Sequence, residues 1–413
     1  MNKLETVILE NGLTLYLYPD KRRHSTFFQF NTFCGGTTKH FLCDGVEYSL
    51  PDGVAHILEH YIVECNQKGN FLTELGEMQM STNASTSFYV TNYYFEAVEE
   101  VLFGIRTILE GVYHVSFEPE KLEKLKNPIY QEIRGKFDNK FYHAGRKRME
   151  NLFPNLDFRD VGGTLEEVES VTIEDLKILY DAFYQPKNQF IVIAGNFNSD
   201  DVLKEIKEFY QNLKLEEHET TLIPYHGDLS LLKEKDSFSF PSPMDYTEIS
   251  FKIDVSKYSS EELLDYDFYL NSFYSSSFGP ASPLYKRLVD EKIIIDSIHC
   301  SDFTMNHFLV ITIGAYTNNV EVFQKCVLEE VNSLENLDSE IFEMDKNSSI
   351  VQLILRGENI FKMIFPFINN IVYFDYPYMD KVEDVQKLSY EEYVSKIKEL
   401  DFSHYTCLTI EKE

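Results

Sequence analysis

The chain has 413 residues, and because domains cluster at about 100–200 residues, two domains are the simplest expectation. Hydrophobic residues make up 43% of the sequence and charged residues 26%, a globular composition that argues against disorder. The formal net charge of -30 argues against nucleic acid and anionic membranes as main partners, because both attract basic surfaces.

The first half of the sequence predicts strands and helices in mixed order. Runs rich in β-branched and aromatic residues predict strands at 7–8, 13–18, 27–33 and 88–95, with Asn11-Gly12 as a hairpin turn. Apolar residues at helical spacing predict helices at 54–63 and 98–112. A long polar helix is expected from 120 to about 151, interrupted or kinked near Pro128. Thr172 begins a capped helix, and a buried strand follows at 190–193.

The last of these helix–strand units recurs at the C-terminal end. Residues 168–193 align without a gap with residues 385–410, helix on helix and strand on strand. We interpret this as duplication of one α+β unit, although any helix–strand pair can be aligned in this way. The predicted domains are 1–212 and 243–413, joined by a linker at 213–242 that is rich in proline, glycine and charge.

The N-terminal segment and the cysteines bear on the compartment. No basic stretch is followed by an apolar one, so we expect no signal peptide. No run approaches the roughly 18 apolar residues of a membrane span. The six cysteines form no C-x-x-C pair, and a chain of this size needs no disulfides. We therefore expect a cytoplasmic protein.

One short motif carries chemistry, His56-x-x-Glu59-His60. Residues four apart lie above one another on a helix, so the two imidazoles can meet at one Zn²⁺ ion. Glu59 lies on nearly the same face and can take a proton from a water molecule there, since zinc lowers the pKa of such a water to about 7. The alternative is a pair of helix histidines satisfied by ordinary hydrogen bonds.

With this motif, the sequence resembles the pitrilysin family of zinc metallopeptidases, which includes insulin-degrading enzyme and mitochondrial processing peptidase. It is particularly similar to bacterial members of about this length, over nearly the whole chain. GVAHILEH at 53–60 matches the zinc helix, and LEKLKNPIYQEI matches the family's second metal helix. The resemblance implies Glu123 as the third zinc ligand, with Glu132 as the alternative because the spacing from His60 to Glu123 is short.

The resemblance also implies where substrate binds. NASTSFYVTNY is similar to a family strand that lines the cleft and pairs with the substrate backbone. The matching positions are Asn83, Ala84, Thr86, Thr91 and Tyr93. An exposed strand from Ser85 to Tyr93 could hold an extended peptide by strand addition. A plain core strand is the alternative.

Several positions depart from the family pattern. Ser116 stands where many members carry a second glutamate seven residues before the ligand, and Leu125 and Pro128 interrupt the metal-helix pattern. Val289 and Asp296 occupy the positions of an arginine and a tyrosine that often contact substrate from the second half. A homologous partner subunit, in a heterodimer or a homodimer, could supply these missing groups.

We therefore predict an α+β fold of two duplicated domains, each a mainly antiparallel sheet covered by helices on one face. Together they would form half of a clam-shell chamber. The predicted function is a zinc-dependent endopeptidase that cleaves short unfolded peptides, with one Zn²⁺ per chain. Acidic chamber walls would favour cationic peptides. The alternatives are the catalytic half of a heterodimer dedicated to one precursor or signalling peptide, and a weakly active or non-catalytic binding subunit.

Overall fold

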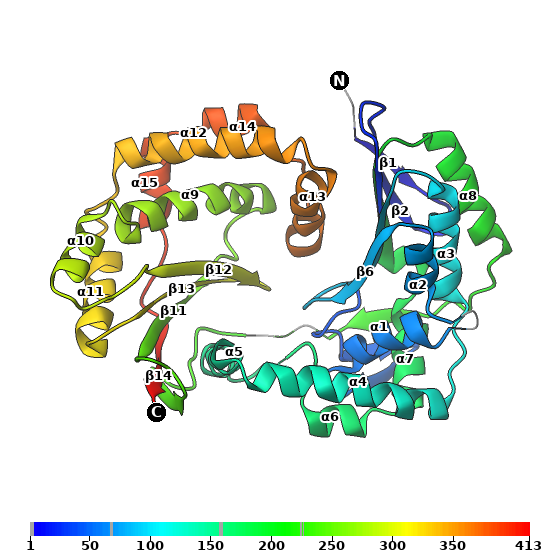
Figure 1. Ribbon diagram of the computed structural model, residues 1–413, viewed down its shortest axis with the longest axis horizontal. Coiled ribbons are helices and arrows are strands. Elements are labelled where there is room, and N and C mark those ends of the chain that lie inside the picture. The colour runs from blue at the N-terminus through cyan, green and yellow to red at the C-terminus, as the bar shows by residue number, and fades with distance from the viewer. Residues whose placement is uncertain (1–3, 67–68, 157–159, 224, 226) are drawn as a thin grey trace. The chain divides into compact units, whose positions relative to one another are not determined.

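The computed structural model describes residues 4–66, 69–156, 160–223, 225 and 227–413. Its α+β architecture confirms the predicted fold class, and the chain forms two compact units (Figure 1). Unit 1 consists of Met1–Lys136, Phe158–Pro224 and Ile360–Ile368; unit 2 consists of Phe137–Asp157, Tyr225–Asn359 and Asn369–Glu413. Two segments thus pack with the opposite half of the chain. The predicted boundaries at 1–212, 213–242 and 243–413 stay a prediction.

Unit 1 is built on a six-stranded sheet in the order β1-β2-β8-β3-β7-β6. Its strands are β1 (Glu5–Ile8), β2 (Thr14–Pro19), β3 (Thr26–Thr32), β6 (Ser81–Thr86), β7 (Thr91–Ala97) and β8 (Gln189–Gly195). All neighbours are antiparallel except β2 and β8. A second, three-stranded sheet in the order β5-β4-β9 contains β4 (His40–Cys43), β5 (Val46–Ser49) and β9 (Thr220–Leu222).

The helices of unit 1 pack against the six-stranded sheet or against one another. They are α1 (Val54–Glu64), α2 (Phe71–Glu77), α3 (Val101–Tyr113), α4 (Pro119–Phe137), α6 (Leu165–Ser170), α7 (Ile173–Phe183) and α8 (Ser199–Asn212), with a 3₁₀ turn η1 (Pro186–Asn188). Helices α1 and α3 contact β7 directly. Residues of β7 alternate between buried and half-buried, and its buried Phe95 lies against Gly104 of α3. This alternation places one face of β7 on the helices.

The opposite face of the sheet is contacted by the first part of α13 (Ile360–Phe374). The Phe361 ring lies 5.6 Å from Phe27 and 5.9 Å from Tyr94, between ring centroids. Phe367 meets Tyr16 edge-to-face at 5.3 Å and is 1% exposed. A segment from late in the sequence therefore completes the apolar packing of unit 1.

Replacing Phe367 by alanine should lower the stability of unit 1 by about 3 kcal/mol, because the variant loses a buried ring and leaves a cavity. Phe365 is the matched control on the same helix, since it is 47% exposed; Phe365→Ala should cost less than about 0.5 kcal/mol. Urea unfolding followed by circular dichroism measures both. Equal effects of the two variants would contradict this role of α13.

Unit 2 contains a five-stranded sheet in the order β10-β14-β11-β13-β12. The strands are β10 (Lys235–Phe240), β11 (Tyr246–Asp254), β12 (His299–Met305), β13 (Phe308–Tyr316) and β14 (Tyr405–Lys412). The helices are α5 (Lys140–Leu152), α9 (Ser260–Phe278), α10 (Pro283–Asp290), α11 (Val320–Ser333), α12 (Ser339–Arg356), α14 (Val382–Lys387) and α15 (Tyr390–Lys398).

The two large sheets share one topology. Strands β2-β8-β3-β7-β6 of unit 1 correspond in order to β10-β14-β11-β13-β12 of unit 2, and in both sheets only the first pair is parallel. The aligned residues Thr172 and Ser389 both cap the helix that precedes the returning strand. The internal repeat seen in the sequence is therefore a repeat of structure, and each of the two large sheets is mainly antiparallel, as predicted, with one parallel pair.

The predicted long helix at 120–151 is interrupted, but not at Pro128. Pro128 lies inside α4 on its exposed side, where water can satisfy the carbonyl group that loses its hydrogen bond. The break comes instead at Asp138 and Asn139, where the Asn139 side chain accepts a hydrogen bond from the Phe141 N–H at 2.9 Å and begins α5.

The predicted strands at 88–95 and 85–93 are also corrected. A turn at residues 87–90 separates β6 from β7, and the Ser87 N–H donates to the Val90 carbonyl at 2.8 Å. The substrate-like motif thus forms a hairpin, with β6 at the edge of the sheet. No helix among the described residues combines the length and apolar character needed to cross a bilayer.

Candidate active site

Helix α1 carries the metal motif and is fixed at its first turn by glycine contacts. Gly53 precedes the helix with a positive φ of 84°, and a Cβ there would lie 2.6 Å from the Gly162 carbonyl oxygen. The backbone of the 160–164 loop can therefore pack against the start of α1 only because this position is glycine. Ile57, Leu58 and Ile62 are fully buried and fix which face of α1 turns toward the cavity.

Three potential ligand atoms meet beside this helix. The Nε2 atoms of His56 and His60 lie 3.2 Å apart, and each is 3.6 Å from Oε2 of Glu132 on α4. Tetrahedral zinc with bonds of about 2.1 Å requires ligand atoms about 3.4 Å apart. The three side chains therefore fit a zinc ion with little movement, and their number leaves the fourth position open.

The structure does not place Glu123 at this site. Its side chain is 65% exposed and forms an ion pair with Lys126 at 2.9 Å. Glu123 precedes Glu132 by nine residues on α4, which corresponds to about 13 Å along the axis and the opposite side of the helix. Glu132, the alternative in the sequence, therefore replaces Glu123 as the candidate third ligand.

Burial and neighbouring charges set the protonation of the three clustered side chains. Burial lowers the pKa of His56 to about 4, which keeps its imidazole neutral and able to donate a lone pair. Burial opposes charge on His60 as well, but the hydrogen bond to Glu132 and the nearby carboxylates raise its pKa. The hydrogen bond with His60 holds the pKa of Glu132 down to about 2. Lys136 pairs with Oε1 of Glu132 at 2.9 Å, so Oε2 of Glu132 stays directed at the histidines.

Glu59 is buried beside the two histidines and has one specific partner. The Thr86 hydroxyl donates a hydrogen bond to Oε2 of Glu59 at 2.6 Å. Burial raises the pKa of this carboxyl, while the Thr86 bond partly offsets that effect. Thr86 thus joins the last residue of β6 to the middle of α1 and fixes the direction of the Glu59 carboxylate.

A cavity of about 520 Å³ opens at this point. It is lined by His56, Glu59, His60, Val63, Glu64, Asn70, Leu72, Asn83, Ala84, Ser85, Thr86, Glu132, Lys136, Val161 and Gly162. Strand β6 forms one wall. Among the residues that the structure describes, it pairs with β7 alone, so its other side is a free edge (Figure 1). Of the residues predicted to bind substrate, Asn83, Ala84 and Thr86 all line the cavity.

Comparison with known proteins agrees with this geometry. Residues 46–154 match the insulinase family, peptidase family M16, and residues 170–349 match the peptidase M16 inactive domain. The chain belongs to the M16 (insulinase) peptidase family. The metal cluster draws on the first matched region, because His56, His60 and Glu132 all lie within 46–154.

Relatives of similar length span almost the whole chain. The zinc protease YmfH of Bacillus subtilis (strain 168) is 25% identical over 407 residues, covering 95% of this chain and 92% of that protein. The zinc protease PqqE of Helicobacter pylori is 22% identical over an alignment that covers 83% of this chain and 77% of PqqE. The fold of an M16-like peptidase from Alicyclobacillus acidocaldarius superposes with a TM-score of 0.89 at 23% identity, covering 100% of this chain and 99% of that one.

The remaining positions of the M16 resemblance are not among the residues that line the cavity. The Thr91 hydroxyl donates to the Cys34 carbonyl at 2.7 Å and lies 3.1 Å from the hydroxyl of Thr86, the residue that bonds Glu59. The Tyr93 hydroxyl pairs with that of Tyr184 at 3.0 Å in the interior of unit 1. Ser116 bonds Glu118. Val289 and Asp296 belong to unit 2.

Sequence reasoning missed two residues at the site, Lys136 and Gly162. A Cβ on Gly162 would come within 3.1 Å of Lys136 Nζ and 3.7 Å of His56 Nδ1. The excess of basic residues at 118–148 was the only signal for Lys136. The Gly162-Gly163 pair did not indicate a role for Gly162 at the site, because such a pair is equally typical of an ordinary turn.

Proposed function

We propose that this M16 family member is a zinc-dependent endopeptidase that cleaves extended, unfolded peptides. The observation that carries the proposal is the convergence of the His56, His60 and Glu132 ligand atoms at 3.2–3.6 Å. Glu59 lies on the same helix, and a free strand edge borders the same cavity. Each element alone is common, but together they provide a metal, a base and a place for a peptide backbone.

When bound, zinc would polarise the scissile carbonyl and lower the pKa of the attacking water. The protein's own part begins with Glu59, which accepts a proton from that water and passes it to the leaving amine. The Thr86 hydroxyl holds the Glu59 carboxylate in place at 2.6 Å. Lys136 holds Glu132 at 2.9 Å and so preserves the direction of the third ligand.

Strand β6 would hold the substrate by strand addition. Main-chain hydrogen bonds to an edge strand tolerate many side chains, which suits a peptidase with broad substrates. Thr82, Ala84 and Thr86 are half-buried, whereas Ser81, Asn83 and Ser85 are exposed on the alternate positions. An added peptide would therefore run past Asn83 and Ala84 toward Glu59.

Assembly and location are further parts of the proposal. Val289 and Asp296 replace the arginine and tyrosine of the family pattern, which supports a homologous partner subunit that completes an enclosed chamber. One relative is named as a subunit, the mitochondrial-processing peptidase subunit beta of Dictyostelium discoideum. The six cysteines are free thiols, which supports a cytoplasmic location.

The test is hydrolysis of a library of short peptides by the purified chain, supplied with zinc. Cleavage should be lost with a chelator and return with added zinc, while a folded protein of the same composition is left intact. Cleavage that persists after complete metal removal would contradict zinc dependence. Absence of cleavage by the metal-loaded chain, alone and with a homologous partner, would contradict peptidase function.

A further inference from the structure

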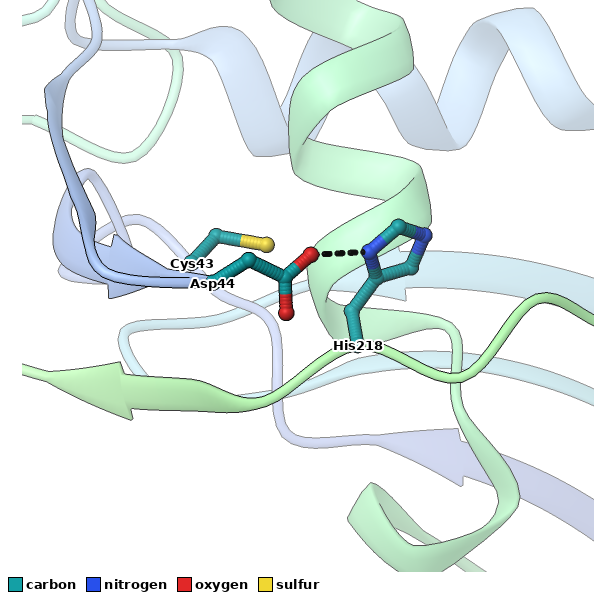
Figure 2. Close-up of side chains that lie close together, drawn as sticks. All are labelled: Cys43, Asp44 and His218. Carbon is teal, nitrogen blue, oxygen red and sulfur yellow. Dashed lines mark hydrogen bonds and ion pairs between the residues drawn. The ribbon is translucent and has the colours of Figure 1, made fainter.

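A second group of metal-ligating side chains lies in the three-stranded sheet, apart from the helix that carries the active-site histidines. Cys43, Asp44 and His218 each offer one donor atom, and these atoms lie within 4.8 Å of one another. Figure 2 shows the Cys43 and Asp44 side chains pointing toward the His218 ring, whose Nδ1 atom faces the Asp44 carboxylate. The Nδ1–Oδ2 distance is 2.7 Å.

The backbone holds these residues in a defined arrangement. Asp44 and Gly45 form the two-residue turn between β4 and β5, with φ values of 50° and 79°. This Asp-Gly turn suits a tight hairpin, because both central residues need a positive φ. Strand β9 pairs with β4 so that Thr220 lies opposite Cys43. Residues distant in sequence are therefore brought together by a fixed register.

The carboxylate of Asp44 is oriented by the main chain. The Glu219 N–H donates to Asp44 Oδ1 at 2.9 Å, and the Asp44 N–H donates to the Glu219 carbonyl at 2.9 Å. This pair of bonds leaves Oδ2 directed at His218. Metal ligands in proteins are commonly oriented by such outer hydrogen bonds. The Asp44 side chain is 53% exposed and His218 is 18% exposed, so an ion can reach the group from solvent.

A catalytic cysteine is the competing interpretation, and the geometry disfavours it. A Cys–His pair needs the histidine within hydrogen-bond reach of the thiol. Here the Nδ1 atom of His218 is engaged by Asp44, and the partner of the Cys43 sulfur is the Thr220 hydroxyl at 3.9 Å.

We propose that Cys43, Asp44 and His218 form a second metal site, which takes one divalent transition-metal ion and prefers Zn²⁺. Sulfur, nitrogen and carboxylate oxygen together are the donor set of zinc, whereas Ca²⁺ and Mg²⁺ select oxygen ligands. Zinc ligand atoms lie about 3.4 Å apart, so the Asp44–His218 contact widens slightly on binding. The three protein ligands leave a fourth position for water.

This site has a structural consequence inside unit 1. Strand β9 is the last element of unit 1 before the chain continues into unit 2 at Tyr225. A metal bound by Cys43, Asp44 and His218 would link the segment that leads into β9 to the β4–β5 hairpin. Amides of β9 should then exchange with solvent more slowly when zinc is bound.

The test uses the full chain in a background that lacks the active-site ligands, His56→Ala/His60→Ala. After metal removal, zinc is titrated in competition with a colorimetric chelator. The background protein is expected to bind one zinc per chain, and adding Cys43→Ser/His218→Ala should abolish that binding. With Co²⁺ as a probe, a thiolate charge-transfer band should appear in the background protein and be absent after Cys43→Ser alone.

The matched control is Cys326→Ser/His404→Ala, which removes another half-buried cysteine and another surface histidine, both in unit 2. It should retain the zinc. Melting curves of the metal-free proteins establish that each variant is folded, and Asp44→Asn provides a second test of the same site. A background protein that binds no zinc, or one whose zinc persists after Cys43→Ser/His218→Ala, overturns the proposal. Because the background lacks the active-site histidines, this result is independent of peptidase activity.

Discussion

Glu59→Gln should reduce kcat/KM for peptide hydrolysis by about 10²–10⁴-fold, the range that a general base contributes. Glutamine keeps the size of the side chain and can still accept the Thr86 hydrogen bond, which is 2.6 Å long in the native protein. It cannot take up a proton from water. The variant should therefore be folded and should bind zinc normally, with the loss expressed in kcat.

Two measurements separate this expectation from simple damage to the site. Zinc content by metal analysis should equal that of the native protein, because Glu59 is not one of the three clustered ligands. Glu77→Gln, at the exposed end of α2, is the matched control and should leave hydrolysis unchanged. A Glu59→Gln protein with native kcat would refute the assigned role of this carboxylate.

The metal helix could be predicted from the sequence because all its information is local. The spacing of His56 and His60 sets their directions on any helix, whatever surrounds it. The structure accordingly places both imidazoles with Nε2 atoms 3.2 Å apart. Glu59 followed from the same reasoning. Thr86, the partner of Glu59, lies in the segment that resembles the family's substrate strand. The Thr86–Glu59 contact itself depends on how β6 packs on α1, so no local sequence pattern predicts it.

The third ligand shows where local information ends. The buried face of α4 is formed by Leu122, Leu125, Lys126, Ile129 and Ile133. Relative to this face, Glu123 and Glu132 lie on opposite flanks, each roughly 80–100° from its centre at 100° per residue. Helical periodicity therefore cannot distinguish Glu123 from Glu132 as the third ligand. Only the packing of α4 against α1, a long-range contact, decides which flank meets the histidines.

The helix and strand boundaries were less predictable for a related reason. Pro128 was expected to break α4, but it lies on the exposed side, where the cost of the missing bond is small. The capping side chain of Asn139 determines the real break. Likewise, apolar and aromatic residues at 88–90 concealed the turn between β6 and β7, since Phe88 and Tyr89 resemble strand residues.

Glu132→Gln should lower zinc affinity by more than about 100-fold, because outer partners of a metal ligand alone are worth about 10–100-fold. Hydrolysis should fall in parallel at low zinc. Glu123→Gln is a closely matched control on the same helix. Both glutamates form an ion pair with a nearby lysine at 2.9 Å, Lys126 for Glu123 and Lys136 for Glu132. Glu123→Gln should keep native zinc affinity and activity.

The comparison is informative because the two substitutions remove the same charge from the same helix. A general electrostatic effect on the site would lower zinc affinity in both variants, whereas direct ligation lowers it only in Glu132→Gln. Zinc loss in Glu123→Gln with normal binding in Glu132→Gln would place the wrong flank of α4 at the metal. Lys136→Met should have an intermediate effect of about 10-fold, since it frees the Glu132 carboxylate without removing it.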